Sequence, residues 1–196
     1  LFGNINPSGK LPVTFMKKWE DTPVHQYYPA PDVVGAHEVD MNVDDAFGNE
    51  NRKNLDMPYK EGIYVGYRHY DKFNVEPLIA FGHGLSYTSF EIKKRKNTID
   101  VQFAVTNTGS IAGAEVAQLY VEDMESILDR PVKELKGFHK VFLNPGETKE
   151  ITLQLEENDL AFYDPDKDVW TVEPGDFTVH IGSSSRDIRL AELFKW

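Results

Sequence analysis

The chain has 196 residues, of which 40% are hydrophobic and 27% charged, and its net charge is −11. This length allows one large domain, or one domain with a piece of another. The negative charge argues against binding to nucleic acid or to an anionic membrane surface, because both need basic patches, and the absence of cysteine excludes disulfides and thiolate metal sites.

Two short β-rich runs lie in the first part of the chain, at residues 11–15 and 63–70. Both faces of the second run carry apolar or small residues, which is typical of a strand buried on both sides of an α/β sheet. We therefore predict a strand at each run. Two strands without helices to cover them cannot form a core, so residues 1–88 are predicted to belong to a larger domain.

A long polar segment, at about residues 17–60, separates these two runs. It contains several prolines and the acidic stretch from Glu38 to Glu50. Segments of this length inside compact domains are usually functional lids or poorly ordered excursions. Its aromatic residues predict that it packs on another part of the protein; they are Trp19, Tyr27, Tyr28, Phe47 and Tyr59.

From about residue 89 apolar and polar residues alternate with a period of two, which predicts strands with one buried and one wet face. The apolar positions of four such strands are Ile99, Val101, Phe103 and Val105; Ala117, Leu119 and Val121; Ile151, Leu153 and Leu155; and Phe177, Val179 and Ile181. Turn sequences separate the runs, and in Pro145-Gly146 and Pro174-Gly175 the proline followed by glycine favours type II turns. About seven short strands with this spacing predict a β-sandwich of immunoglobulin or fibronectin type III kind.

Several motifs occur in a fixed order along the chain. They are NPSGKLPVTF at 6–15, EGIYVGYRHYD at 61–71, FGHGLSYT at 81–88, VTNTG at 105–109, AGAEVAQLYV at 112–121, RPVKELKGF at 130–138, LNPGET at 143–148 and the closing stretch 170–182. In this order they resemble the C-terminal part of the family 3 glycoside hydrolases, the family of β-glucosidases and β-xylosidases. The resemblance covers nearly the whole chain outside about residues 20–57.

The resemblance implies a mainly β fold in two parts. Residues 1–88 would be the C-terminal tail of an α/β sandwich domain, with the long insert at about 17–60. Residues 89–196 would be a fibronectin type III-like β-sandwich. The expected role of this chain is structural support of the catalytic domains.

The resemblance also implies a retaining hydrolysis of terminal β-linked sugars, with an Asp nucleophile from a barrel and an acid/base Glu from the α/β domain. By the family's order both carboxylates lie upstream of Asn6, so no catalytic, cofactor-binding or metal-binding residue is predicted in this chain, and no cofactor. The implied partners are the missing N-terminal catalytic part, made of the barrel and most of the α/β domain, and a β-glycoside substrate. The chain begins at Leu1 without an initiator methionine or signal peptide, so we expect an internal start, with localisation open between cytoplasm and export.

Two acidic patterns resemble functional sites. Glu61 and Asp71 flank the second run, but ten residues of extended chain would separate them by about 33 Å, so surface or capping roles are expected. Residues 40–44 have the opening spacing of a calcium loop. Asp45 replaces the required glycine and Asn51 the bidentate Glu, and a solvated acidic loop is expected instead.

The histidines show no paired metal spacing; they are His25, His37, His69, His83, His139 and His180. His83, between two glycines, is expected to be a hydrogen-bonded turn residue. Two interpretations of Arg68 and His69 stay open. They could contact the substrate near the sugar site, or they could pack or form an ion pair at the interface between domains. The basic patch 130–133 is predicted to be a loop with a structural arginine.

Aromatic residues of the second half offer a sugar-stacking platform, although such residues more often lie in a sandwich core or between domains. They are Phe138, Phe142, Phe162, Tyr163, Trp170 and Phe177. The alternative function is therefore a stand-alone, non-catalytic adhesion or carbohydrate-binding module. Such a module would have no use for two isolated strands of an α/β sheet, which distinguishes the two hypotheses.

Overall fold

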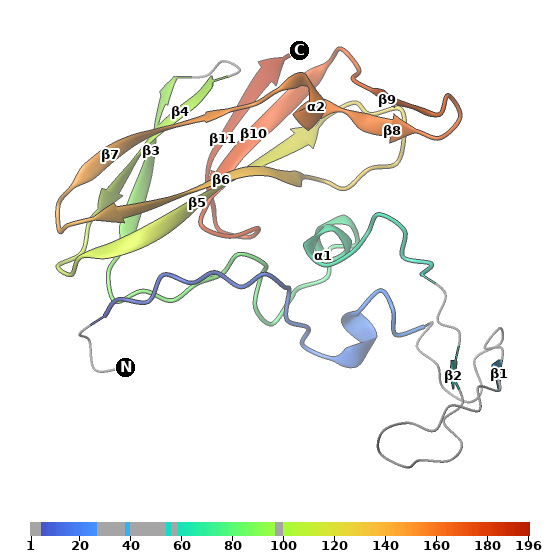
Figure 1. The fold of residues 1–196 in the computed structure, drawn as a ribbon, viewed down its shortest axis with the longest axis horizontal. Coiled ribbons are helices and arrows are strands. Elements are labelled where there is room, and N and C mark those ends of the chain that lie inside the picture. The colour runs from blue at the N-terminus through green and yellow to red at the C-terminus, as the bar shows by residue number, and fades with distance from the viewer. Residues whose placement is uncertain (1–4, 27–37, 40–53, 56–58, 97–99) are drawn as a thin grey trace.

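The computed structural model describes residues 5–26, 38–39, 54–55, 59–96 and 100–196 (Figure 1). The second half forms a two-sheet β-sandwich, and the first part, which contains few regular elements, lies against it. Within these described segments no helix combines the length and the apolar character needed to cross a membrane.

The sandwich consists of two antiparallel sheets. One has the strand order β3-β4-β7, and the other has the order β11-β10-β5-β6. The strands are β3 (Phe90–Lys96), β4 (Asp100–Asn107), β5 (Gly113–Asp123), β6 (Glu134–Leu143), β7 (Thr148–Gln154), β10 (Asp176–Gly182) and β11 (Ile188–Lys195). The β-sandwich predicted from the alternating pattern is confirmed.

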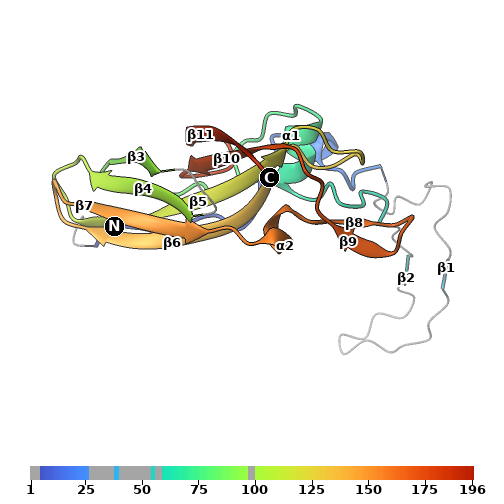
Figure 2. The same cartoon turned by 90° about the horizontal axis from the view of Figure 1, so that it is seen from above.

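Shorter elements complete the described part. They are the 3-10 helix η1 (Trp19–Asp21), the helices α1 (Tyr67–Lys72) and α2 (Glu157–Leu160), and the strands β1 (Glu38–Val39), β2 (Asn54–Leu55), β8 (Phe162–Asp164) and β9 (Val169–Thr171). β1 pairs with β2, and β8 with β9. The β8–β9 hairpin and α1 lie at the same end of the sandwich in both views (Figures 1 and 2).

The core lies between the two sheets, where the predicted inward positions meet. On β4, Val101, Phe103 and Val105 are between 0% and 3% exposed, and Leu119 on β5 is 1% exposed. They belong to one buried cluster with residues of β3, β6, β7 and β10. Full burial stabilises each such side chain by about 1.5–3 kcal/mol relative to an exposed position, so this cluster holds the sandwich together.

The outer face of β5 differs from the prediction. Gln118 and Tyr120 were expected to face water, but they are 3% and 0% exposed. The Gln118 side-chain amide donates hydrogen bonds to the carbonyls of Gly82 (3.1 Å) and Ser183 (2.8 Å). The Tyr120 ring packs edge-to-face on Tyr67, with centroids 5.8 Å apart. The first part of the chain covers this face, which a pattern local to β5 cannot reveal.

The strand predicted at residues 11–15 is present only in part. Leu11 exchanges backbone hydrogen bonds with Gly82 and His83, both 2.8 Å long. Phe15 forms an isolated antiparallel bridge with Ile79. The segment is thus paired with residues 78–83, although it does not form a continuous ladder.

The strand predicted at residues 63–70 is wrong. Gly66 has φ 58°, a left-handed conformation that ends any extended run, and α1 begins at the next residue. The helix buries Tyr70, which is 3% exposed, and the Tyr67 ring stacks on Phe81 with centroids 5.0 Å apart. Tyr67 and Tyr70 therefore serve a helix face that packs on the sandwich, whereas Ile63 and Val65 lie before the helix and are exposed.

The two Pro-Gly turns behave differently. Gly146 has φ 75°, as a type II turn requires, whereas Gly175 has no positive φ, so the type II prediction is wrong there. The backbone of Gly175 instead exchanges hydrogen bonds with Trp196 (3.3 and 3.0 Å). It therefore extends the pairing of β10 with β11 and does not occupy the centre of a turn.

Candidate functional site

A set of paired charges, here called the seam, joins α1 to the sandwich; the Asp71 and Lys133 side chains are largely buried, whereas the Arg186 side chain is 32% exposed. Asp71 on α1 accepts hydrogen bonds from Lys133 (2.5 Å) and from Arg186 Nε (2.8 Å), and its side chain is 5% exposed. Arg186 also donates to the carbonyls of Tyr70 (3.0 Å) and Val75 (3.1 Å). Charge-assisted bonds are strong where water is excluded. The seam therefore fixes the end of α1 to the loops before β6 and after β10.

A second ion cluster lies beside the seam. Arg130 bridges Asp123 (2.8 Å) and Glu134 (3.2 Å), and Arg68 reaches Glu134 at 3.0 Å. Burial acts to raise the pKa of Glu134, but the positive charges of Lys136, Arg68 and Arg130 outweigh it, and the pKa lies below its usual value. Of the two interpretations of Arg68, the ion pair with the sandwich is the one observed, and the basic patch 130–133 is structural as predicted.

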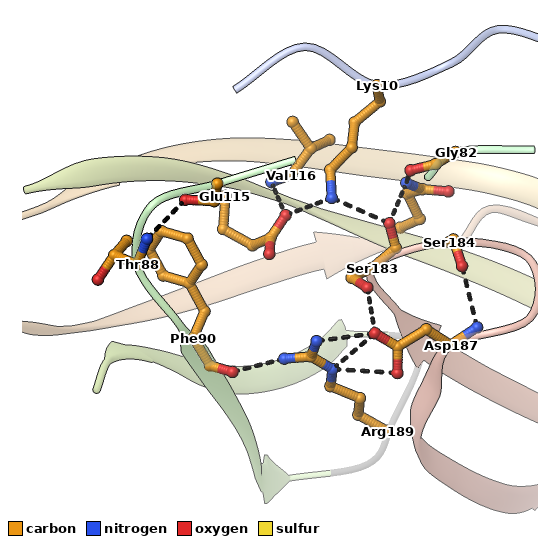
Figure 3. A network of polar contacts seen from close by, with 12 residues as sticks. Lys10, Gly82, Thr88, Phe90, Glu115, Val116, Ser183, Ser184, Asp187 and Arg189 are labelled. Carbon is orange, nitrogen blue, oxygen red and sulfur yellow. Dashed lines mark hydrogen bonds and ion pairs between the residues drawn. The ribbon is translucent and has the colours of Figure 1, made fainter. Parts of the chain in front are cut away.

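A third polar network anchors the beginning of the described chain (Figure 3). Lys10 pairs with Glu115 at 2.6 Å and donates to the carbonyl of Ser183 at 3.1 Å. Asp187 accepts from Arg189 at 2.7 Å and from the hydroxyl of Ser183. The Arg189 hydrogen bond lowers the pKa of Asp187 against the opposing effect of burial. The first part is thus attached to the sandwich at several separate points.

A pocket of about 320 Å³ lies between η1, the turn at residues 60–64 and α1. It is lined by Glu20, Thr22, Pro23, Gln26, Lys60, Glu61, Tyr64, His69 and Phe73. Three rings form one wall: Phe73 packs edge-to-face with Tyr64 (centroids 5.6 Å apart) and lies 5.0 Å from the His69 ring. The pocket therefore combines an aromatic wall with several hydrogen-bonding groups.

Two titratable groups of the pocket are in unusual environments. The Oε2 atom of Glu61 is buried and, within the described part of the chain, has no hydrogen-bond partner. Burial lowers the pKa of His69, opposed by a hydrogen bond with the backbone of Asp21. The imidazole is therefore uncharged at neutral pH, and one ring nitrogen donates while the other accepts.

The two carboxylates compared in the sequence do not act together. Asp71 is held in the seam, and Glu61 lines the pocket. His69 lines the same pocket as Glu61, whereas its neighbour Arg68 points to Glu134. His83 supports a turn, as predicted, because its N–H donates to the Ala80 carbonyl at 3.2 Å.

No metal centre is found where the structure describes the chain, since no three His, Asp or Glu side chains there come close enough to hold an ion. The calcium-like residues 40–45 and Asn51 lie outside the described residues. The prediction of a solvated acidic loop at this position therefore stays a prediction.

The six aromatic residues considered as a sugar-stacking platform do not lie together on one surface. Phe162 and Phe177 are 7% and 1% exposed and belong to the interior. The four exposed rings lie on two separate elements: Phe138 and Phe142 on β6, and Tyr163 and Trp170 on the β8–β9 hairpin. The sequence alone does not show which strands are neighbours, so aromatic residues that point into the core and residues that point outward could not be separated.

The seam and the pocket include residues that the sequence did not single out. Arg186 follows three serines in the β10–β11 loop, and Glu20 and Gln26 lie in the long polar segment. No local motif marks any of them. Their roles depend on contacts between segments that are distant in the sequence: Arg186 donates to the Tyr70 carbonyl across 116 positions, and Glu20 and Gln26 line the pocket with residues 60–73.

Two domain families match this chain. Residues 1–67 match the glycosyl hydrolase family 3 C-terminal domain, and residues 115–185 match the fibronectin type III-like domain. Thermostable beta-glucosidase B of Acetivibrio thermocellus is 44% identical over 98% of this chain, which spans 24% of that relative's length. Beta-glucosidase B of Emericella nidulans is 41% identical over 96% of this chain, which spans 22% of its length.

Solved structures of β-glucosidases resemble this chain over nearly its whole length. The beta-glucosidase of Kluyveromyces marxianus in complex with glucose matches 99% of this chain at 36% identity with a TM-score of 0.82. Beta-glucosidase 3B of Thermotoga neapolitana in complex with α-D-glucose matches 98% at 39% identity with a TM-score of 0.81. This chain covers 22% and 25% of those two proteins. The similarity thus extends over the first part and the sandwich together.

Proposed function

We propose that this chain, which belongs to glycosyl hydrolase family 3 and corresponds to the C-terminal part of its members, supports the catalytic domains of a β-glucosidase. The whole enzyme would hydrolyse terminal β-linked sugars with retention of configuration. Two domain matches and relatives named as beta-glucosidases support this assignment. The activity itself would depend on residues that this chain does not contain.

An uncovered apolar surface on the first part carries the proposal. In residues 5–26 and 59–88, only Tyr70 is a large hydrophobic side chain that is buried. The exposed ones, between 41% and 81% accessible, are Ile5, Val13, Phe15, Met16, Trp19, Tyr59, Ile63, Val65, Phe73, Leu78, Leu85 and Tyr87. Many exposed apolar side chains in one part of a chain indicate that this part is covered by an interaction partner. We assign these side chains, apart from Phe73, which lines the pocket, to an interface with the remaining part of the α/β domain.

The two parts of the chain would have different roles in the enzyme. Residues 1–88, with the insert at about 17–60, would complete the α/β domain, and residues 89–196 would form the fibronectin type III-like domain. The seam would make the two parts one unit, because Asp71 binds Lys133 and Arg186 of the sandwich. The sandwich would thereby brace the catalytic domains.

The catalytic carboxylates would come from the rest of the enzyme. A retaining mechanism needs two carboxyl groups about 5–5.5 Å apart, one as nucleophile and one as acid and base. In this chain Asp71 is neutralised by two cations, and Glu61 lies in a different environment. We therefore propose no catalytic role for Asp71 or Glu61. The proposed partners of this chain are the N-terminal catalytic part of the enzyme and a β-glycoside substrate.

The stand-alone binding module is the less favoured alternative. The exposed aromatic residues Trp170 and Phe138, 68% and 67% accessible, are compatible with it. However, a free module would leave the apolar surface of the first part in water, which promotes association. The uncovered surface therefore favours a part of a larger enzyme.

Association with a catalytic part tests the proposal directly. Mixed with the Acetivibrio thermocellus relative truncated of its matching C-terminal quarter, this chain is expected to form a one-to-one complex, because its apolar surface would be covered. Native mass spectrometry measures the complex. A chain that stays free, while the relative's own C-terminal quarter binds under the same conditions, would contradict the proposal.

A further inference from the structure

We infer that the pocket between η1, the 60–64 turn and α1 binds the pyranose ring of a sugar or glycoside. Its volume of about 320 Å³ lies at the lower end of ligand pockets, which span about 300–1,000 Å³. The aromatic wall and the polar groups converge on the same space (Figure 1 shows α1 beside the η1 segment). A small, rigid ligand with an apolar face and a polar rim fits such a lining.

The aromatic wall supplies the surface for stacking. Phe73 is 56% exposed although it packs against Tyr64 and His69, so one side of its ring is available. Aromatic faces carry partial negative charge, and they attract the weakly positive C–H groups that line one face of a pyranose. Contacts among the three rings hold the wall in place before any ligand arrives.

The polar side of the pocket favours hydroxyl groups. The buried Oε2 of Glu61 is an acceptor without a partner in the described chain, and a ligand hydroxyl would satisfy it. Thr22 and Gln26 add donors and acceptors. Burial lowers the pKa of His69, which favours the neutral imidazole; its single N–H is used in the hydrogen bond with the Asp21 backbone, so the other ring nitrogen is left as an acceptor. A neutral ligand with several hydroxyls would satisfy this mixture.

The charges of the lining disfavour other ligand classes. Glu20 and Glu61 outnumber Lys60, which leaves one net negative charge and repels phosphates and carboxylates. The described chain has no cluster of three His, Asp or Glu side chains that could hold a metal here. A purely apolar ligand would leave Glu61 unsatisfied. The choice of glucose and methyl β-D-glucoside as first ligands rests on the proposed function.

Titration of the 196-residue chain tests the inference. The aromatic ¹H–¹³C signals of Tyr64, His69 and Phe73 are followed by NMR while glucose or methyl β-D-glucoside is added. We expect saturable shifts with a dissociation constant in the millimolar range. Glycerol, which has hydroxyls but no ring face, should bind at least about tenfold more weakly.

Two variants and one control make the result decisive. Glu61→Gln keeps the shape but weakens the acceptor, and Phe73→Ala removes the stacking surface; each should weaken binding at least about tenfold. Phe138→Ala removes an exposed ring on β6, away from the pocket lining, and should leave binding unchanged. Circular dichroism verifies that all three variants are folded.

Three results would overturn the inference: no saturable shift at any soluble sugar concentration, equal affinity for glycerol, or equal weakening by the Phe138 variant. Each is independent of the proposed function. Association with the catalytic part is measured by mass spectrometry in the absence of sugar, and it does not require the pocket to bind anything. The two proposals can therefore fail separately.

Discussion

Replacing Asp71 with alanine is expected to lower the free energy of unfolding by about 3–5 kcal/mol. The substitution leaves Lys133, with a side chain 11% exposed, and Arg186 without their shared carboxylate. A buried cation that loses its partner keeps the cost of desolvation but not the attraction that offset it. Urea denaturation of the full chain, followed by circular dichroism, measures the change.

Asp129→Ala is the matched control for this experiment. Asp129 also pairs with a residue of α1, Lys72, but its side chain is 69% exposed. Surface pairs contribute little to stability because water and salt screen them, so the control should be destabilised much less than Asp71→Ala. If Asp71→Ala destabilised the chain no more than the control, the seam would not couple α1 to the sandwich.

The substitution Gly82→Ala is expected to cost about 2–5 kcal/mol, from two causes. Gly82 has φ 78°, where a side chain adds about 1–2 kcal/mol of strain. A methyl group there would also lie 2.2 Å from Gln118 Oε1, and overpacking adds about 1–3 kcal/mol. Gln118 cannot easily move, because its side-chain NH2 donates hydrogen bonds to the carbonyls of Gly82 and Ser183. Its Oε1 also accepts a hydrogen bond from the Tyr120 hydroxyl at 2.6 Å.

Gly146→Ala separates these two causes. Gly146 has a similar φ of 75°, but nothing lies within 4 Å of the position of the added methyl group. It should therefore cost only the strain, about 1–2 kcal/mol. Thermal or urea unfolding measures the loss of stability of each variant. If Gly82→Ala and Gly146→Ala lost the same free energy of unfolding, the residues around Gly82 would have moved to accommodate the methyl group, and the first part would not be rigidly attached there.

Much of the sandwich could be predicted from the sequence, because its information is local. On β4 the alternation of Val101, Phe103 and Val105 with polar residues reports which face is buried. The turn at Gly146 is equally local, since only the backbone conformation of that residue is involved. Where burial is decided within a single strand, the alternation of apolar and polar residues was enough to predict it.

The remaining features depend on distant segments. Tyr120 is fully buried because Tyr67 and Phe81 cover its side of the sheet. The apolar run at 63–70 is compatible with a strand, but residues 60–63 form a turn in which Gly62 has φ 56°, and Gly66, with φ 58°, directly precedes α1. In isolation, short apolar runs do not distinguish helix from strand.

The candidate site was less predictable than the fold. His69 was considered, with Arg68, for a sugar contact from its place at the end of the predicted strand at 63–70, and the structure places it in the pocket. Glu61 was examined only as a partner of Asp71, and Arg186 was not considered. Ion pairs and pocket linings are assembled from segments far apart in the chain, so residue spacing carries little information about them.

If this chain is a non-catalytic support that a β-glucosidase needs, it should restore activity to a relative that lacks the matching part. The matching C-terminal quarter of the Acetivibrio thermocellus relative is replaced by this chain, and hydrolysis of an aryl β-glucoside is compared among the chimera, the truncated relative and this chain alone. We expect the chimera to be active, and both the truncated relative and this chain alone to be inactive. Hydrolysis by this chain alone, or full activity of the truncated relative, would contradict this expectation.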